Sequence, residues 1–182
     1  NDSGVAEQHA QKLAKEQGKI YVSPYNDPQI IAGQGTLAIE LLDQLPRLDV
    51  VYVSIGGGGL ISGIGCVLKA FSPRTRVVGV SAKNSAELAA SIRAGKMVKV
   101  DHFETLADGC AGGVDNDTIT LGLGSEVIDD LIDCSEGQIE VGLQQIAWKE
   151  KMLVEGSAGL AYAAWKEDAS NNKNKISAVV LC

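Results

Sequence analysis

Four consecutive glycines, Gly56–Gly59, stand between a run of β-branched residues and a stretch of helical periodicity. Val50–Ser54 predicts a buried strand, and the apolar spacing of Leu60–Ala70 predicts a helix. A strand joined directly to a helix is half of a βαβ unit. Four residues without side chains also let the backbone approach an anion closely at the positive N-terminus of that helix. We therefore expect a phosphate-binding turn, with a simple tight strand-to-helix turn as the alternative.

The rest of the chain alternates between strand and helix patterns. Weak periodicity and many glycines predict a long loop over residues 95–124. The other expected elements are a helix over residues 4–17, a strand at Ile20–Val22, helices at Thr36–Leu45, Ala86–Ala94, Ser135–Lys151 and Ala158–Trp165, and strands at Val77–Val80 and Ile176–Cys182. This alternation predicts an α/β fold with an open, mostly parallel sheet and helices on both faces.

Composition excludes several classes of protein. The 182 residues are 45% hydrophobic and 21% charged, with a formal net charge of −7. Nucleic-acid binding requires clustered positive charge, so no nucleic-acid partner is expected. No apolar run approaches the roughly 20 residues that a membrane helix needs, so no membrane partner is expected. The four cysteines are far apart and form no zinc-type pair, which predicts reduced thiols and a cytoplasmic location.

The residues around the glycine turn restrict the kind of phosphate it would bind. A nucleoside triphosphate site requires Gly-Lys-Ser/Thr after the loop, and Leu60–Ser62 follows instead. A dinucleotide site requires a spaced GxGxxG and an acidic residue at the tip of the next strand, where Ser81 stands. A small phosphorylated cofactor without ribose fits better, and a nicotinamide-dependent reductase is a weaker alternative.

Four motifs in a fixed order carry a family resemblance. They are Ile31–Thr36, Gly56–Ile64, Thr105–Gly109 and Val154–Gly159. Together they resemble the pyridoxal-phosphate-dependent serine/threonine dehydratases and serine racemases of fold type II, whose sheet is like that of the tryptophan synthase β-subunit. The resemblance extends over essentially the whole chain and implies pyridoxal 5′-phosphate as the cofactor.

The resemblance also implies which residues hold the cofactor phosphate. The backbone N–H groups of Gly56, Gly57, Gly58 and Gly59 would bind it, with Leu60 next to them. This assignment agrees with the anion-binding turn expected from the residues themselves.

Two further residues match family positions near the cofactor ring. Cys182 follows the apolar residues 178–181 and matches the Ser, Thr or Cys that contacts the pyridine nitrogen. A neutral partner leaves the ring less electron-withdrawing than an acidic one. From the residues alone, Cys182 is equally well a buried cysteine at a strand end. Glu155 matches a family glutamate near the cofactor, with a carboxylate at a helix start as the alternative.

Some family members bind a divalent cation through residues that follow the strand after the glycine loop. The usual pattern is an acid at the strand end, a small residue four later and an acid six later. Ser81, Ser85 and Glu87 occupy these places. Glu87 and the backbone of Ser85 are therefore the candidate metal ligands. Ser81 lacks the first carboxylate that a hard cation prefers, which argues against metal binding.

No catalytic residue is assigned. The family's covalent lysine, in a Ser-x-Lys-x-Arg-like motif, and its Ser-Gly-Asn-His loop have no counterpart here. The chain is thus expected to be the C-terminal half of such an enzyme, with residues 1–26 as the tail of the small domain and 27–182 as most of the C-terminal part of the large cofactor-binding domain. Unpaired sheet edges predict association, most simply as a homodimer.

The resemblance implies an ammonia-lyase reaction for the parent enzyme. Its substrate would be a small amino acid, L-threonine, L-serine or a related 3-hydroxy amino acid, and its products a 2-oxo acid and ammonia. The isolated 182 residues are predicted to be inactive. A serine racemase and a truncated, non-catalytic phosphate-binding or interaction module are the alternatives.

Overall fold

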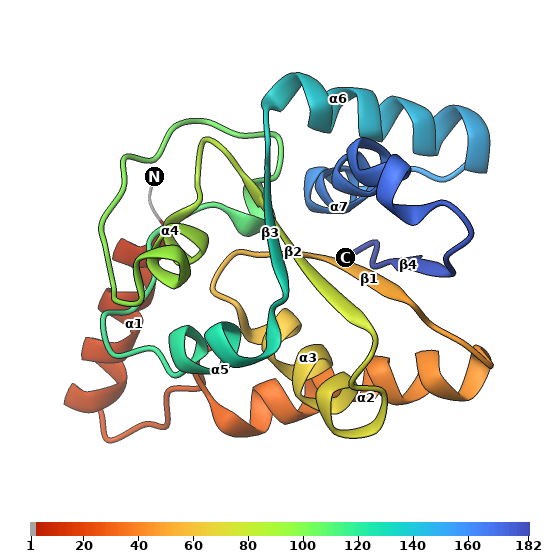
Figure 1. Cartoon of the computed structure of the whole chain (residues 1–182). Coiled ribbons are helices and arrows are strands. Elements are labelled where there is room, and N and C mark those ends of the chain that lie inside the picture. The colour runs from red at the N-terminus through yellow and green to blue at the C-terminus, as the bar shows by residue number, and fades with distance from the viewer. Residues whose placement is uncertain (1–2) are drawn as a thin grey trace.

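The computed structural model describes residues 3–182, which fold around a four-stranded sheet of order β3-β2-β1-β4 (Figure 1). All strand pairs are parallel. The strands are β1 (Val50–Ser54), β2 (Arg76–Ala82), β3 (Asp130–Cys134) and β4 (Ser177–Val179). In register, Val51 of β1 lies opposite Val77 of β2 on one side and Ala178 of β4 on the other. The predicted α/β fold with an open parallel sheet is confirmed.

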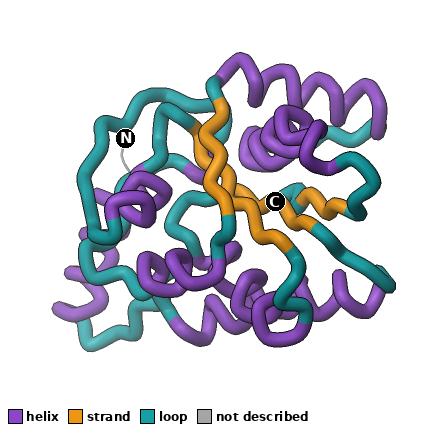
Figure 2. Tube along the Cα trace, viewed as in Figure 1, coloured by secondary structure: helices purple, strands orange, loops and turns teal. Residues whose placement is uncertain are grey.

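Helices cover both faces of the sheet (Figures 1 and 2). The longer helices are α1 (Ser3–Glu16), α2 (Pro28–Gln44), α3 (Gly59–Phe71), α4 (Glu87–Ala94), α5 (Thr120–Val127), α6 (Glu136–Gln145) and α7 (Gly156–Glu167). Single 3₁₀ segments span Asp108–Cys110 and Asp168–Asn172, and a π-helical turn, Ile146–Glu150, extends α6. None of the helices in the described part of the chain is long and apolar enough to cross a membrane.

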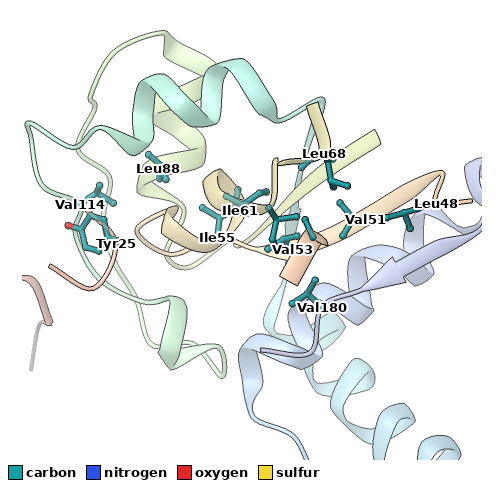
Figure 3. Packing of buried hydrophobic residues seen from close by; sticks show 13 residues of the cluster. Tyr25, Leu48, Val51, Val53, Ile55, Ile61, Leu68, Leu88, Val114 and Val180 are labelled. Atoms are coloured by element: carbon teal, nitrogen blue, oxygen red, sulfur yellow. The ribbon is translucent and has the colours of Figure 1, made fainter. Parts of the chain in front are cut away.

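The side chains of β1 alternate between two buried layers. Val51 and Val53 belong to a cluster with Ile61 of α3, which Figure 3 shows from close by. Val50 and Tyr52 point to the opposite face and belong to the cluster that includes residues of α6 and α7. Every residue of β1 is buried, as expected of a central strand in a parallel sheet covered on both faces.

Glycines let α2 and α3 pack closely against each other. A Cβ atom on Gly63 would lie 2.2 Å from the carbonyl oxygen of Ile31 and 2.8 Å from the backbone nitrogen of Gly35. These distances leave no room for a side chain. The first two family motifs therefore meet at this helix crossing, directly behind the glycine turn.

One predicted strand and one predicted helix boundary in the N-terminal part are wrong. Ile20–Val22 is not a strand: Ile20 is 91% exposed and the segment pairs with no strand of the described sheet. α2 begins at Pro28 rather than Thr36. Asp27 caps it by accepting hydrogen bonds from the backbone N–H groups of the next turn, and proline is favoured at the first helical position.

Differences also occur in the C-terminal half. The predicted loop over residues 95–124 contains a 3₁₀ turn and the start of α5. β3 was not expected, because Asp130 and Asp133 interrupt the apolar pattern of a strand at the edge of the sheet. The last strand covers only Ser177–Val179, and the chain continues to Cys182 without regular structure.

Candidate functional site

A cavity of about 680 Å³ lies at the carboxyl ends of β1 and β4. Its lining comes from segments far apart in the sequence: Pro24–Tyr25, Gly56–Leu60, Asp108–Gly113, Glu155, Ser157 and Val180–Cys182, with Glu7, Gln34, Leu37 and Ser54. Ligands of open α/β sheets bind at this edge. The structure thus brings all seven predicted cofactor-binding residues, Gly56, Gly57, Gly58, Gly59, Leu60, Glu155 and Cys182, to one cavity.

A second hollow of about 930 Å³ lies between α2, α3 and α5. Apolar side chains such as Ile31, Val67, Phe71 and Leu123 line most of it. A small-molecule site combines an apolar wall with a few convergent polar groups. The cavity at the strand ends has such groups and this hollow has few, so the former is the candidate site.

The glycine turn requires residues without side chains. A Cβ atom on Gly57 would lie 2.3 Å from Cγ of Tyr25, and one on Gly59 would lie 2.9 Å from Cα of Tyr25. Gly58 has a φ of 86°, a left-handed conformation that other residues rarely adopt. Gly58 is also the N-cap of α3, and no side chain caps that helix. The backbone N–H groups of the first turn therefore remain suited to an anion.

Two residues that the sequence analysis did not identify hold this turn in place. Thr120 Oγ1 donates a hydrogen bond to the carbonyl oxygen of Gly57 at 2.7 Å. The Tyr25 ring packs beneath the turn, and its Oη accepts a hydrogen bond from the backbone N–H of Asp115 at 2.9 Å. Burial raises the pKa of the Tyr25 phenol, which keeps it neutral. The only local sign of a structural role for Tyr25 is its place between two prolines. The residues around Thr120 carry no sign of its contact with the glycine turn.

The opposite wall is built where the last two motifs meet. A Cβ atom on Gly156 would lie 1.7 Å from the carbonyl oxygen of Leu106, and one on Gly109 would lie 3.2 Å from Oε1 of Glu155. Ser54 Oγ donates a hydrogen bond to the carbonyl oxygen of Ser157 at 2.6 Å. The turn at Gly109, the start of α7 and the end of β1 therefore form one continuous surface.

Glu155 immediately precedes α7, as the alternative interpretation of a carboxylate at a helix start required. Its side chain, however, accepts no capping hydrogen bond from that helix. The carboxylate lies against Gly109 in the cavity wall. Glu155 therefore lies in the cavity wall and also at the N-terminus of α7, where the helix dipole favours a negative charge.

Cys182 lines the cavity beyond β4. Partial burial raises the pKa of its thiol, and burial raises the pKa of the nearby Cys110 to about 11. Both sulfurs are therefore neutral thiols near neutral pH. A neutral thiol suits the uncharged ring partner that the resemblance implies.

The candidate metal ligands Glu87 and Ser85 lie together at the start of α4, and their side chains are hydrogen-bonded to other residues. Glu87 Oε1 accepts hydrogen bonds from Lys99 Nζ and from the backbone N–H of Val114, both at 2.9 Å, while Oε2 lies 3.0 Å from His102 Nε2. The Ser85 hydroxyl lies 2.9 Å from His102 Nδ1. Within residues 3–182, no group of three or more His, Cys, Asp or Glu side chains could hold a metal ion. The donors present do not fit a divalent cation, which prefers several carboxylate oxygens.

The parallel sheet and the cavity at its carboxyl edge define an open-sheet α/β protein with a candidate ligand site at the strand ends. Comparison with known proteins agrees: the family described as pyridoxal-phosphate dependent enzyme matches residues 1–182. The chain belongs to this family.

The relatives include lyases and racemases. An L-threonine ammonia-lyase of Thermotoga maritima is 33% identical over 94% of this chain, and a catabolic L-threonine dehydratase of Escherichia coli is 37% identical over 84%. Threonine deaminase isoform 2 of Solanum lycopersicum, in its processed form, superposes with a TM-score of 0.88 at 28% identity over 96% of this chain. Serine racemase of Dictyostelium discoideum superposes with a TM-score of 0.84 at 26% identity, also over 96%.

These matches cover only part of the relatives. The chain spans 42% of the Thermotoga protein and 46% of the Escherichia protein, and 51% and 56% of the two solved chains. It therefore spans about half the length of the relatives it matches.

Proposed function

We propose that this chain forms the phosphate- and ring-binding part of a pyridoxal-phosphate-dependent ammonia-lyase that converts L-threonine, L-serine or a related 3-hydroxy amino acid to a 2-oxo acid and ammonia. The observation that carries this proposal is the convergence of the glycine turn, Glu155 and Cys182 on one cavity at the sheet edge. The names of the relatives, threonine ammonia-lyase and threonine dehydratase among them, support the choice of reaction.

Each of the seven predicted cofactor-binding residues has a part in this proposal. The backbone N–H groups of Gly56–Gly59 and Leu60, at the start of α3, bind the phosphate. The Cys182 thiol faces the pyridine nitrogen as a neutral partner, and Glu155 lies at the opposite wall. When bound, pyridoxal phosphate supplies an electron sink that acidifies the α-proton of an amino acid.

The residues that line the cavity include no lysine. The described residues of the cavity therefore do not supply the lysine that holds the cofactor covalently in this family. This observation favours one rival, a non-catalytic module that binds a phosphorylated ligand. It also leads us to propose that the 182 residues alone do not catalyse the reaction.

Expression of the complete coding sequence tests the proposed function. Its product is incubated with pyridoxal phosphate and either L-threonine or L-serine, and 2-oxo acid and D-amino acid are both measured. We expect 2-oxo acid from the complete product and none from the 182 residues alone. D-serine as the main product would replace the lyase with a racemase. Ligand binding with no turnover of any amino acid by the complete product would favour the non-catalytic module.

A further inference from the structure

Lys99 forms an ion pair with the buried carboxylate of Glu87 next to the candidate site. Its Nζ donates to Glu87 Oε1 at 2.9 Å and to the carbonyl oxygen of Val114 at 3.3 Å. We propose that the Lys99 ammonium joins the start of α4 to the loop that follows this helix, so that this region is ordered without a metal ion. The inference is independent of the reaction proposed above.

Charge balance is the first argument. Glu87 is only 3% exposed, and an unpaired buried carboxylate is costly. Burial tends to raise its pKa, but hydrogen bonds from Lys99, the Val114 N–H and His102 outweigh that effect and lower the pKa below the usual value. Ser81, at the place of the missing carboxylate, is 1% exposed and carries no charge. One anionic group is thus matched by one ammonium group, with an imidazole beside it.

The second argument is the position of these contacts. Val114 and the neighbouring Gly112 belong to the loop that forms part of the cavity wall, and Gly112 N–H donates to Ser85 Oγ at 3.1 Å. Leu88, the residue after Glu87, lies where a Cβ atom on Gly58 would meet its Cδ2 at 2.3 Å. Ser85 therefore contacts the cavity wall directly through Gly112, and Glu87 is linked to the glycine turn through its neighbour Leu88.

The third argument is that Lys99 forms an ion pair with the buried Glu87 carboxylate while its own side chain stays exposed. Its side chain is 64% exposed while that of Glu87 is 2% exposed. A surface cation can dissociate and rebind, so its contribution to global stability is modest. Its effect is therefore expected mainly in the order of the loop rather than in the cohesion of the core.

The unaltered chain provides the first test. Its thermal unfolding is followed after treatment with EDTA and after addition of MgCl₂, MnCl₂ or CaCl₂. We expect each treatment to shift Tm by less than about 1 °C, since the site needs no metal. A saturable rise in Tm with any of these cations, or a fall with EDTA, would overturn the proposal.

A pair of variants provides the second test. Lys99→Met keeps most of the side-chain length and removes the charge, and Lys96→Met is the matched control, because Lys96 Nζ makes no hydrogen bond or ion pair with the described residues. We expect Lys99→Met alone to lower Tm by about 2–4 °C and to speed amide hydrogen exchange over residues 108–118. Exchange in α6 should not change. Equal exchange of residues 108–118 in the two variants would contradict the assignment.

Discussion

The ring of Tyr25 lies so close to Gly57 that a Cβ atom on that glycine would come within 2.3 Å of the ring Cγ. Tyr25 is 8% exposed and belongs to the same buried cluster as Val114, which lies near it at one end of the cluster in Figure 3. The glycine turn is therefore shaped from below by a side chain of the N-terminal segment. The absence of a side chain at Gly57 is a packing requirement as well as a condition for ligand approach.

Gly57→Ala should distort the turn. The added methyl group meets an aromatic ring that is fixed by burial, so we expect a loss of about 1–3 kcal/mol in the free energy of unfolding and weaker binding of phosphorylated ligands. Gly33→Ala is the matched control, because a Cβ atom there meets nothing within 4 Å in the exposed part of α2. That control should be neutral or stabilising by up to about 1 kcal/mol. Urea denaturation compares the two, and equal stabilities would refute the packing argument.

Thr120→Val should loosen the glycine turn without a large change in volume. It removes the 2.7 Å hydrogen bond from Oγ1 to the carbonyl oxygen of Gly57. We expect a loss of about 0.5–1.5 kcal/mol in stability and a several-fold weaker affinity for a phosphorylated ligand, measured by calorimetry. Ser125→Ala is the control, since Ser125 donates only to Leu121 within the same helix. If both variants bind the ligand like the unaltered chain, Thr120 does not position the turn.

Gly156→Ala should be among the most damaging single changes. Its Cβ atom would lie 1.7 Å from the carbonyl oxygen of Leu106, which is backbone and cannot rotate away. A loss of about 3 kcal/mol or more is expected, or failure to fold. Gly137→Ala, at an exposed position of α6 with open space around it, should fold normally. Soluble yield and Tm report both outcomes, and a Gly156→Ala chain with unchanged Tm would contradict the close contact.

Asp168 should contribute to the acid dependence of stability. Burial alone would raise its pKa, but hydrogen bonds from Tyr52, Asn171 and Arg76 and the charge of Arg76 lower it below the usual value of 3.8. A lowered carboxyl pKa stabilises the fold above about pH 4, and this stabilisation is lost as the pH falls through the folded-state pKa.

Asp168→Asn is therefore expected to lower stability at pH 7 and to flatten the decline of stability as the pH falls below about 4. Urea midpoints measured across this range check the prediction. Asp117→Asn removes an exposed carboxylate and is the control. A parallel decline in the Asp168→Asn and unaltered chains would show that Asp168 is not responsible.

Local patterns were sufficient for the centre of the fold. β1 and α3 were predicted nearly to the residue, because a wholly buried strand and an amphipathic helix each carry their own signal. The start of α6 was likewise predicted at Ser135, which forms a capping box with Gln138 in the structure. The start of α2 was predicted at Thr36 rather than Pro28, although Asp27 and Pro28 are a local signal for a helix N-terminus.

Contacts between distant segments were beyond local patterns. β3 is stabilised by pairing with β2. Its two aspartates interrupt the apolar pattern by which a strand is predicted from sequence. Thr120 acts on a residue 63 positions away, and nothing in its own neighbourhood indicates this. Family motifs located Glu155 and Cys182, but only the fold places them in the same cavity as the glycine turn. The same holds for Glu87, whose partners Lys99 and His102 come from the loop that follows α4.

The central claim, that the glycine turn binds the phosphate of a pyridoxal-type cofactor, is tested most directly by calorimetric titration of the chain with pyridoxamine 5′-phosphate and with pyridoxamine. Both lack the aldehyde that would react with surface lysines. The phosphorylated compound should bind at least about tenfold more tightly, a difference of about 1.4 kcal/mol or more, and inorganic phosphate should compete with it. Equal affinities for the two compounds, or binding that phosphate does not affect, would contradict the account.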